Sequence, residues 1–265
     1  MKLKDLGKTK IYISDKIEKY PEVITLSTTR FYEEGSFNMS ISEKTFEKDS
    51  APGNRKRLAE LLGISTSNFI FSKQIHSNNI LVIDSNKYAG RGSLIYDSAI
   101  DDNDGYVTNI PNICLCIISS DCTPVFFYDP IKKVIGAVHA GRKGTFLNIT
   151  GMAVEKMKSI YGSNSKDIIA CIGPAIGSCH YEIGPEIVDE MKKLNIEKYI
   201  VRKADKGHAY IDLEKMNVEQ LIAAGLNDEN IEASKLCTIC NDDFFSYRQY
   251  GAGSSQLASG IMLKY

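Results

Sequence analysis

Cys122 and His139 are the residues whose types and spacing first suggest chemistry in this chain. Cys122 precedes an apolar run at 125–128, and His139 ends a second one at 134–138, with an Asp-Pro turn signal at 129–130 between them. A β-hairpin of this kind brings the start of its first strand beside the end of its second. We therefore expect the thiol and the imidazole to be neighbours, an arrangement suited to binding zinc or copper or to activating a cysteine nucleophile.

His76 is a third candidate for the same site. It stands in a polar stretch, residues 74–79, where a histidine is poorly explained as part of a hydrophobic core. Together with Cys122 and His139 it would supply two imidazoles and one thiolate. Three such ligands leave one tetrahedral position of zinc open for water or substrate, which is typical of a catalytic rather than a structural site. The separations along the chain match no short metal-binding motif, so a metal-free Cys–His pair stays open at this point.

The elements that must position these residues follow from the spacing of apolar side chains. Alternating polar and apolar residues predict strands, and a repeat of about 3.6 residues predicts helices. The predicted strands are 10–14, 22–29, 37–41, 105–108, 113–118, 125–128, 134–138, 168–172, 198–203 and 208–212. The predicted helices are 146–160, 185–194, 213–224 and one that starts at Asp49-Ser50 and ends at Gly63.

Two further segments, 68–73 and 79–84, are predicted to pair as a hairpin whose connection carries His76. Hairpins outnumber βαβ units in this scheme, which favours one α/β domain over residues 1–265, with a mixed and largely antiparallel β core. Residues 85–104 form a long polar stretch in which Asp97, Asp101, Asp102 and Asp104 are expected to lie in solvent.

The overall composition limits the possible partners. The formal net charge is −1 and no large cluster of Lys or Arg is present. We therefore expect no electrostatic binding to nucleic acid or to an anionic membrane surface. No apolar run approaches the ~18 residues of a membrane span, and the N-terminus lacks the apolar core of a signal peptide. We expect a cytoplasmic protein with a small-molecule substrate; the oligomeric state stays open.

The seven cysteines are an odd number, which favours reduced thiols in a cytosolic protein. Cys237-x-x-Cys240 has the spacing of half a zinc ribbon or of a redox pair, but no second Cys pair stands at ribbon spacing. We expect it to be structural. His180, next to Cys179, is a possible soft ligand for which a structural role is also favoured.

At the level of motifs the chain resembles the YfiH/laccase-domain family, whose members are described as polyphenol oxidases, purine nucleoside phosphorylases or peptidoglycan-editing factors. The resemblance runs in order across nearly the whole chain, through Ser36-Phe37-Asn38-Met39, Asn54-Arg55, Lys73-Gln74-Ile75-His76, Asp104-Gly105-Tyr106-Val107-Thr108, Ser120-Asp121-Cys122-Thr123-Pro124-Val125, Val138-His139-Ala140-Gly141, Ile172-Gly173-Pro174-Ala175-Ile176-Gly177, Tyr181-Glu182 and Phe245-Ser246-Tyr247-Arg248. It implies a layered α/β sandwich similar to that of bacterial toxins that use a Cys–His pair as a hydrolase.

The resemblance also implies site roles. It implies that His76, Cys122 and His139 bind zinc and that Asn38 and Arg55 line the same pocket. The guanidinium of Arg55 would suit a phosphate, and Asp121, beside a ligand, would orient a histidine or relay a proton. One departure affects the substrate range, because Arg142 replaces the Trp that the family usually carries after His-Ala-Gly.

Four functions follow as hypotheses. The first is a zinc-dependent enzyme of purine nucleosides, which uses phosphate to cleave adenosine, inosine, guanosine or methylthioadenosine and also deaminates adenosine. The second is a copper-dependent polyphenol oxidoreductase, for which four histidines in all are few. The third is a metal-free Cys–His hydrolase or editing factor, with Cys122 as nucleophile and His139 as base, acting on peptidoglycan precursors. The last is a binding module without catalysis.

Overall fold

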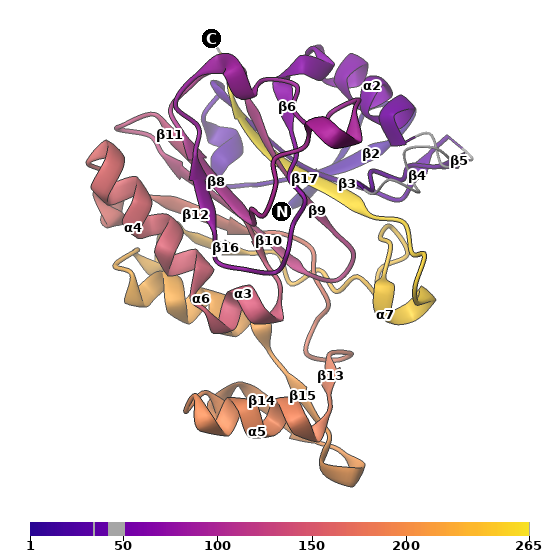
Figure 1. The fold of residues 1–265 in the computed structure, drawn as a ribbon, viewed down its shortest axis with the longest axis vertical. Helices are drawn as coiled ribbons and strands as arrows, with labels where there is room; N and C mark the ends of the chain where they lie inside the picture. Colours follow the sequence, from indigo (N-terminus) through magenta and orange to yellow (C-terminus); the bar gives the residue numbers. More distant parts are fainter. Residues whose placement is uncertain (34, 42–50, 265) are drawn as a thin grey trace.

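Two β-sheets packed face to face form the centre of this computed structural model, which describes residues 1–33, 35–41 and 51–264 (Figure 1). The first sheet has the order β1 (Lys2–Asp5), β2 (Lys10–Ile13), β3 (Val23–Thr28), β17 (Leu257–Leu263), β9 (Cys114–Ser119), β6 (Phe69–Ile70). The second has the order β16 (Ile231–Ala233), β12 (Ile169–Ile172), β10 (Thr123–Asp129), β11 (Val134–Ala140), β8 (Gly105–Thr108), β7 (Ile80–Val82). Among the described pairings most are antiparallel; β6–β9, β7–β8 and β12–β16 are parallel. The layered, largely antiparallel α/β architecture is therefore confirmed.

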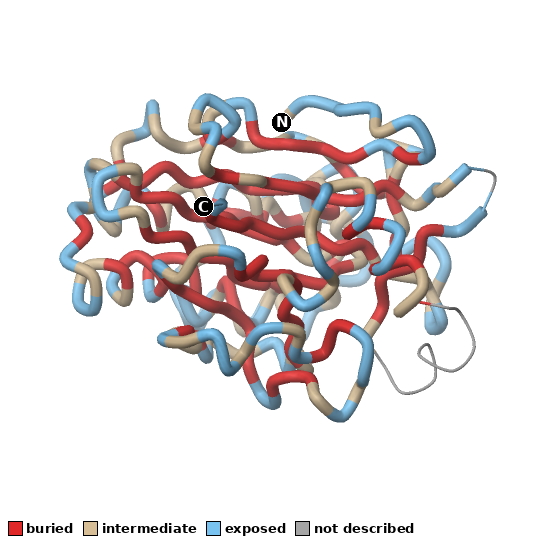
Figure 2. Tube along the Cα trace, turned by 90° about the horizontal axis from the view of Figure 1, so that it is seen from above, coloured by how far each residue is buried: buried red, intermediate tan, exposed pale blue. Residues whose placement is uncertain are grey.

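The central strands are apolar throughout because both faces of the second sheet are covered. Phe126 and Tyr128 of β10 point toward the first sheet, whereas Val125 and Phe127 point to the opposite face and pack against helix α4 (Ile149–Tyr161). Every residue of β10 and β11 is buried. Figure 2 shows buried segments running through the middle of the molecule. Coverage on both faces explains why alternation is weak in these runs.

Helices complete the outer layers. α4 and α6 (Leu213–Ala223) cover the outer face of the second sheet, and α2 (Ala51–Leu62) covers that of the first. Gly63 ends α2 as predicted, with a φ of 67°; the predicted start at residues 49–50 lies outside the described residues. The predicted helix 146–160 is instead divided into α3 (Arg142–Phe146) and α4, because Asn148 adopts a left-handed φ of 59° between them.

A small three-stranded sheet extends from this body at the bottom of Figure 1. It consists of β13 (Glu182–Ile183), β15 (Ala209–Ile211) and β14 (Ile200–Lys203), and α5 (Pro185–Lys193) packs on it through a separate apolar cluster. A two-stranded ribbon, β4 (Phe31–Tyr32) with β5 (Gly35–Ser36), and the short helix α7 (Tyr247–Tyr250) complete the chain. In the described part of the chain, no helix has the length and apolar character needed to cross a bilayer.

Two local predictions are wrong. Segments 68–73 and 79–84 do not pair as a hairpin: β6 joins β9 in the first sheet and β7 joins β8 in the second, both in parallel. The connection therefore crosses from one sheet to the other. Local periodicity does not predict which distant strands a segment pairs with. Residues 37–41 are not a strand, although the backbone N–H of Met39 donates to the carbonyl of Gln256 at 2.9 Å.

Candidate metal centre

Four neighbouring strands begin or end close together at one end of the second sheet. The β10–β11 hairpin forms as predicted, with Pro124 opposite His139, so Cys122 leaves the hairpin next to that histidine. β8 runs antiparallel to β11 and begins at Gly105, opposite Val138, which places Asp104 beside His139. β7 lies parallel to β8, and the segment before it carries His76. The sheet thus brings together residues that are far apart in sequence.

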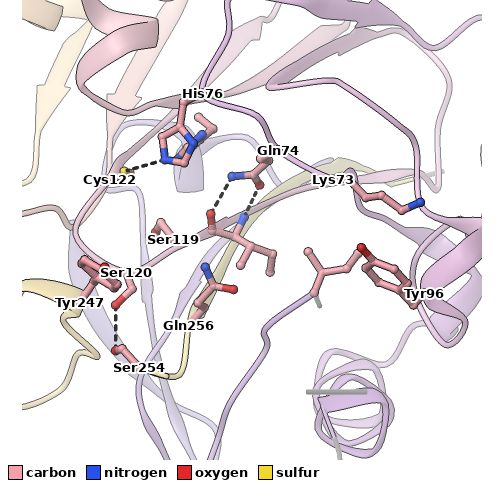
Figure 3. A pocket seen from close by; sticks show the side chains of 13 residues that line it. Lys73, Gln74, His76, Tyr96, Ser119, Ser120, Cys122, Tyr247, Ser254 and Gln256 are labelled. Carbon is pink, nitrogen blue, oxygen red and sulfur yellow. Dashed lines mark hydrogen bonds between the residues drawn. The ribbon is translucent and has the colours of Figure 1, made fainter. Parts of the chain in front are cut away.

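His76, Cys122 and His139 form a compact group, and Figure 3 shows the His76 ring beside Cys122. The Nε2 of His76 lies 3.9 Å from the Sγ of Cys122, and one ligand atom from each of the three residues lies within 4.8 Å of the others. The two imidazole rings stand edge to face, with centroids 4.8 Å apart and an interplanar angle of 74°. Zn–S and Zn–N bonds of about 2.3 and 2.1 Å place tetrahedral ligands roughly 3.5–3.8 Å apart. The donor set and its spacing fit a zinc ion after small side-chain movements.

Gly141 leaves room for this group. A Cβ at position 141 would lie 3.0 Å from the Cys122 sulfur, 3.1 Å from the His76 ring and 3.5 Å from the His139 ring. The φ of Gly141 is −65°, which any residue can adopt. The glycine is therefore required for space beside the three donor side chains, not for its backbone conformation.

Asp104 holds both histidines in place. Its Oδ1 accepts a hydrogen bond from Nδ1 of His139 at 2.9 Å, which directs Nε2 of that ring away from the carboxylate. The same carboxylate accepts the backbone N–H groups of Ile75, His76 and Ser77 at 3.2, 3.0 and 2.7 Å. Burial raises the pKa of Asp104, but hydrogen bonds from His139 and Ser77 outweigh this effect and lower the pKa to about 2.

The prediction that Asp104 lies in a solvated loop is wrong. Asp97 and Asp102 are at least partly exposed and Asp101 is largely exposed, whereas Asp104 is fully buried. The sequence does hold a signal for Asp104. This acidic residue stands directly before an apolar strand, and another strand of the same sheet ends in a histidine.

The thiol and the His139 imidazole form a charged pair when no metal is bound. Burial raises the pKa of Cys122, but the charge of His139 and hydrogen bonds to both histidines lower it to about 6. Burial lowers the pKa of His139, and the Cys122 thiolate and Asp104 together raise it to about 9. The sulfur is therefore a thiolate at neutral pH, which is the form that binds metal ions or attacks an electrophile.

Two strained backbones flank the group. His76 has a φ of 61° and Asp121 a φ of 88°, values that are uncommon for residues with a Cβ. The N–H groups around His76 are held by Asp104, and the carboxylate of Asp121 accepts bonds from the Thr238 hydroxyl at 2.5 Å and the Arg248 N–H at 2.7 Å. The surrounding contacts thus fix both conformations, a pattern that is concentrated at functional sites.

Two cavities lie next to Cys122. The larger, about 450 Å³, is lined by His76 and His139 and by polar and aromatic side chains; those labelled in Figure 3 include Gln74, Tyr96, Ser120, Tyr247, Ser254 and Gln256. The smaller, about 230 Å³, is lined by Arg142, Tyr181 and Arg248 together with Ser120, Asp121 and Tyr247, which it shares in part with the larger one. Cys122 lines both cavities.

The other predicted site residues take different positions. Neither Asn38 nor Arg55 is among the described residues that line these two cavities. The Arg55 guanidinium has no exposed surface and donates to the carbonyls of Met39, Ser40, Gly92 and Ser93 at 2.6–3.0 Å. Asn38 Oδ1 accepts from Ser40 and from the Gln256 N–H. Asp121 accepts from the Thr238 hydroxyl and the Arg248 N–H, and Asp104 is the residue that orients His139.

Comparisons with family models, known sequences and solved structures all find related proteins. Residues 26–264 match the family model described as multi-copper polyphenol oxidoreductase laccase. A purine nucleoside phosphorylase of Bacteroides thetaiotaomicron is 32% identical over 82% of this chain and 81% of its own length. An adenosine deaminase, RL5, from an unknown prokaryotic organism is 32% identical over 79% and 80%. The crystal structure of the hypothetical protein YfiH from Bacillus licheniformis, 31% identical, covers 99% of both chains with a TM-score of 0.90.

Proposed function

This chain belongs to the family of multi-copper polyphenol oxidoreductase laccases, the YfiH family, and we propose that within it the chain is a zinc-dependent enzyme that cleaves purine nucleosides with phosphate. The single observation that carries the proposal is the His76–Cys122–His139 group at the junction of two cavities. Relatives named purine nucleoside phosphorylase and adenosine deaminase support the substrate class. Adenosine, inosine, guanosine and methylthioadenosine are the proposed substrates, with adenosine deamination as a second reaction.

We assign the larger cavity to the nucleoside. Its aromatic rings, Tyr96 and Tyr247, offer faces against which a purine can stack. Gln74 is fixed by two bonds to the backbone of Ile118, with its amide donating at 2.8 Å and its carbonyl accepting at 2.8 Å. The rigid amide holds that wall of the cavity in place, which reduces the ordering cost of binding.

We assign the smaller cavity to phosphate. The side chains of Arg142 and Arg248 line it, and guanidinium groups bind phosphate oxygens through paired hydrogen bonds. Tyr181 adds a neutral hydroxyl, because burial and the nearby Cys122 charge raise its pKa to about 12. The replacement of the family's usual Trp by Arg142 therefore adds a cation to this cavity; its Nη1 also pairs with Glu190 at 2.8 Å.

In the proposed phosphorolysis, a phosphate oxygen forms a bond to C1′ of the ribose while the bond from C1′ to the purine nitrogen breaks. The electron pair of that bond leaves with the purine, which takes up a proton. Zinc bound by His76, Cys122 and His139 would supply a Lewis acid and acidify a bound water. Asp104 keeps the Nδ1 proton on His139, and the arginines of the smaller cavity orient the phosphate. Arg55 acts at a distance, by ordering the loops at 39–40 and 92–93.

The test is product analysis with zinc-loaded protein. Incubation with inosine and phosphate should yield the free base and ribose 1-phosphate, and incubation with adenosine alone should yield inosine and ammonia. Cys122→Ala is the control. Product formation no greater than in this control would overturn the proposal. Activity that survives a chelator but is abolished by alkylation of Cys122 would identify the metal-free Cys–His hydrolase instead.

Copper-dependent oxidation of phenols is the second candidate, and the description of the family model favours it. The same nitrogen and sulfur donors bind Cu²⁺ more tightly than Zn²⁺. The whole chain has four histidines, and two of them belong to the group at Cys122. Oxidation by copper-loaded protein that is lost in His76→Ala would support this candidate, whereas oxidation that survives the substitution would indicate adventitious copper.

A further inference from the structure

A second group of soft donor atoms lies apart from the centre at His76. Cys179 and His180 follow the glycine-framed loop 173–177, which leaves β12, and Cys237 and Cys240 lie in the loop that leaves β16. One donor atom from each of the four residues lies within 4.8 Å of the others. Three thiols and one imidazole from two distant segments thus face one another.

The distances within this group are those of a tetrahedral metal site. The Nδ1 of His180 lies 3.2, 3.7 and 3.4 Å from the sulfurs of Cys179, Cys237 and Cys240, and the sulfurs of Cys179 and Cys240 are 3.6 Å apart. Zn–S and Zn–N bonds of about 2.3 and 2.1 Å give tetrahedral edges of roughly 3.6–3.8 Å. These four distances, with the 4.8 Å limit on the others, are close to the spacing of ligands around one zinc ion.

The surrounding backbone is built for a thiolate at Cys237. The N–H of Gly177 donates to its sulfur at 3.3 Å, and the backbone N–H groups of Ile239 and Cys240 also point to it. Such donors stabilise negative charge on a partly enclosed sulfur. Gly177 is needed for this approach, since a Cβ there would lie 3.1 Å from the Cβ of Cys237 and 3.2 Å from the sulfur of Cys179.

We propose that Cys179, His180, Cys237 and Cys240 form a closed, structural Zn²⁺ site of the Cys₃His type. Three thiolates select zinc over hard cations such as magnesium or calcium. Four protein ligands fill the tetrahedron, and this distinguishes the site from the three-ligand centre at Cys122, which leaves a position for a reactant. The sequence favours metal-free structural roles for Cys237-x-x-Cys240 and His180, and the proposal replaces these roles with a structural metal site.

The site would fasten two loops that support the active centre. Backbone bonds already join those loops: the N–H of Ala175 donates to the carbonyl of Leu236 at 3.1 Å, and that of Thr238 to the carbonyl of Ala175 at 3.0 Å. Both loops also hold Asp121, through the N–H of Ile176 at 2.9 Å and the hydroxyl of Thr238 at 2.5 Å. Because Asp121 precedes Cys122, zinc in this site would fix the backbone that presents that thiol.

Zinc content measured per chain tests the proposal. The full-length protein is purified under reducing conditions without chelator, and zinc is quantified by elemental analysis. We expect two zinc ions in the native protein, one in Cys122→Ser, one in Cys240→Ser and none in the double variant. With Co²⁺ in place of zinc, the Cys122→Ser protein should show thiolate-to-metal charge-transfer absorption that Cys240→Ser removes from the same background.

His180→Ala and His208→Ala form a matched pair, because His208 is partly exposed and pairs with Glu182 at 2.8 Å outside the group. Zinc should be lost from the first and retained by the second, with circular dichroism confirming that each variant is folded. Absence of zinc in folded Cys122→Ser, or retention of zinc by the double variant, would overturn the proposal. So would peptide mass spectrometry showing a disulfide between Cys179 and Cys240 in protein prepared without reductant. If the centre at Cys122 binds no zinc, Cys122→Ser leaves the zinc content unchanged while Cys240→Ser removes it, so failure of the proposed function is distinguishable.

Discussion

The Nδ1 of His139 lies 2.9 Å from the Oδ1 of Asp104, and the same buried carboxylate accepts the backbone N–H of His76 at 3.0 Å. One side chain therefore sets the position of both histidines of the group. Hydrogen bonds of this kind fix the tautomer and orientation of a ligating imidazole. Substitution of Asp104 should therefore weaken metal binding while the rest of the fold is kept.

Asp104→Asn should weaken zinc binding by about 10–100-fold, because the amide removes the charge that holds the His139 proton and replaces one acceptor oxygen with a donor. Competition with a chromogenic chelator measures the affinity. Asp101→Asn is the matched control, since Asp101 is largely exposed and pairs with Lys73 at 2.9 Å. Equal zinc affinities of the two variants would contradict the role assigned to Asp104.

Gly141→Ala should lower zinc occupancy and activity together, because the new Cβ must lie about 3 Å from the Cys122 sulfur and the His76 ring. The backbone conformation at 141 is one that alanine adopts readily. The free energy of unfolding should therefore change little, although zinc is lost. Gly35→Ala is the control, because the nearest described atom to a Cβ there is the Tyr32 carbonyl oxygen at 3.4 Å. Normal zinc content in Gly141→Ala would show that the donors are more widely separated in solution.

The thiolate at Cys122 should be visible in the pH dependence of alkylation of the metal-free protein. A thiol with a lowered pKa reacts as its deprotonated form, so the rate should rise with pH through a midpoint near 6 and then level off. Peptide mass spectrometry separates Cys122 from the other cysteines. In His139→Ala the midpoint should move up toward about 8.5, the value of an unperturbed thiol. A midpoint near 8.5 in the native protein would refute the charged pair.

Arg55→Lys should destabilise the fold rather than change the affinity for phosphate. A lysine cannot make the four guanidinium bonds to the carbonyls of Met39, Ser40, Gly92 and Ser93, and the cost should be about 3 kcal/mol in the free energy of unfolding. Burial lowers the pKa of Arg55 to about 10, so the group stays charged at neutral pH. Urea unfolding measures the loss; unchanged stability with a raised KM for phosphate would restore Arg55 as a substrate ligand.

Arg142→Ala should raise the KM for phosphate by about 10-fold or more, which is the value of one lost charge-assisted hydrogen bond. Deamination of adenosine needs no phosphate, so its rate should be retained and serves as an internal control. Arg202→Ala is the external control, because Arg202 is exposed and stacks 3.9 Å from the centre of the Tyr210 ring, outside both cavities. An unchanged KM for phosphate in Arg142→Ala would remove phosphate from the smaller cavity.

Local sequence information was sufficient for the hairpin that carries Cys122 and His139. Two apolar runs and the turn at Asp129 determine its register, and the carboxylate of Asp129 accepts from the N–H groups of Ile131 and Lys132 as a turn-forming aspartate does. The same holds for the end of α2 at Gly63. These features depend on neighbours within a few residues, which is the range that periodicity and turn chemistry report.

Periodicity and turn signals do not predict which strands pair when they lie far apart in the chain. The segment at 68–84 looks like a hairpin, yet its two strands join different sheets, because their partners β9 and β8 lie elsewhere in the chain. For the same reason the sequence predicts an exposed position for Asp104, which the fold buries, and it does not reveal that the Arg55 guanidinium binds backbone carbonyls. Burial of a charged side chain is decided by the partners that the fold supplies, and these are not visible in the residue itself.

The sequence by itself determined the strand–turn–strand that places a thiol beside an imidazole, and through its motifs it determined the family. Only the tertiary structure decided that Asp104 orients the histidines, that Arg55 is enclosed by carbonyls, and that four donors at 179, 180, 237 and 240 converge. The physical reason is that hydrogen bonds and metal sites depend on distances between atoms. Those distances, for residues tens of positions apart, are set by the packing of two sheets and by the loops that connect them.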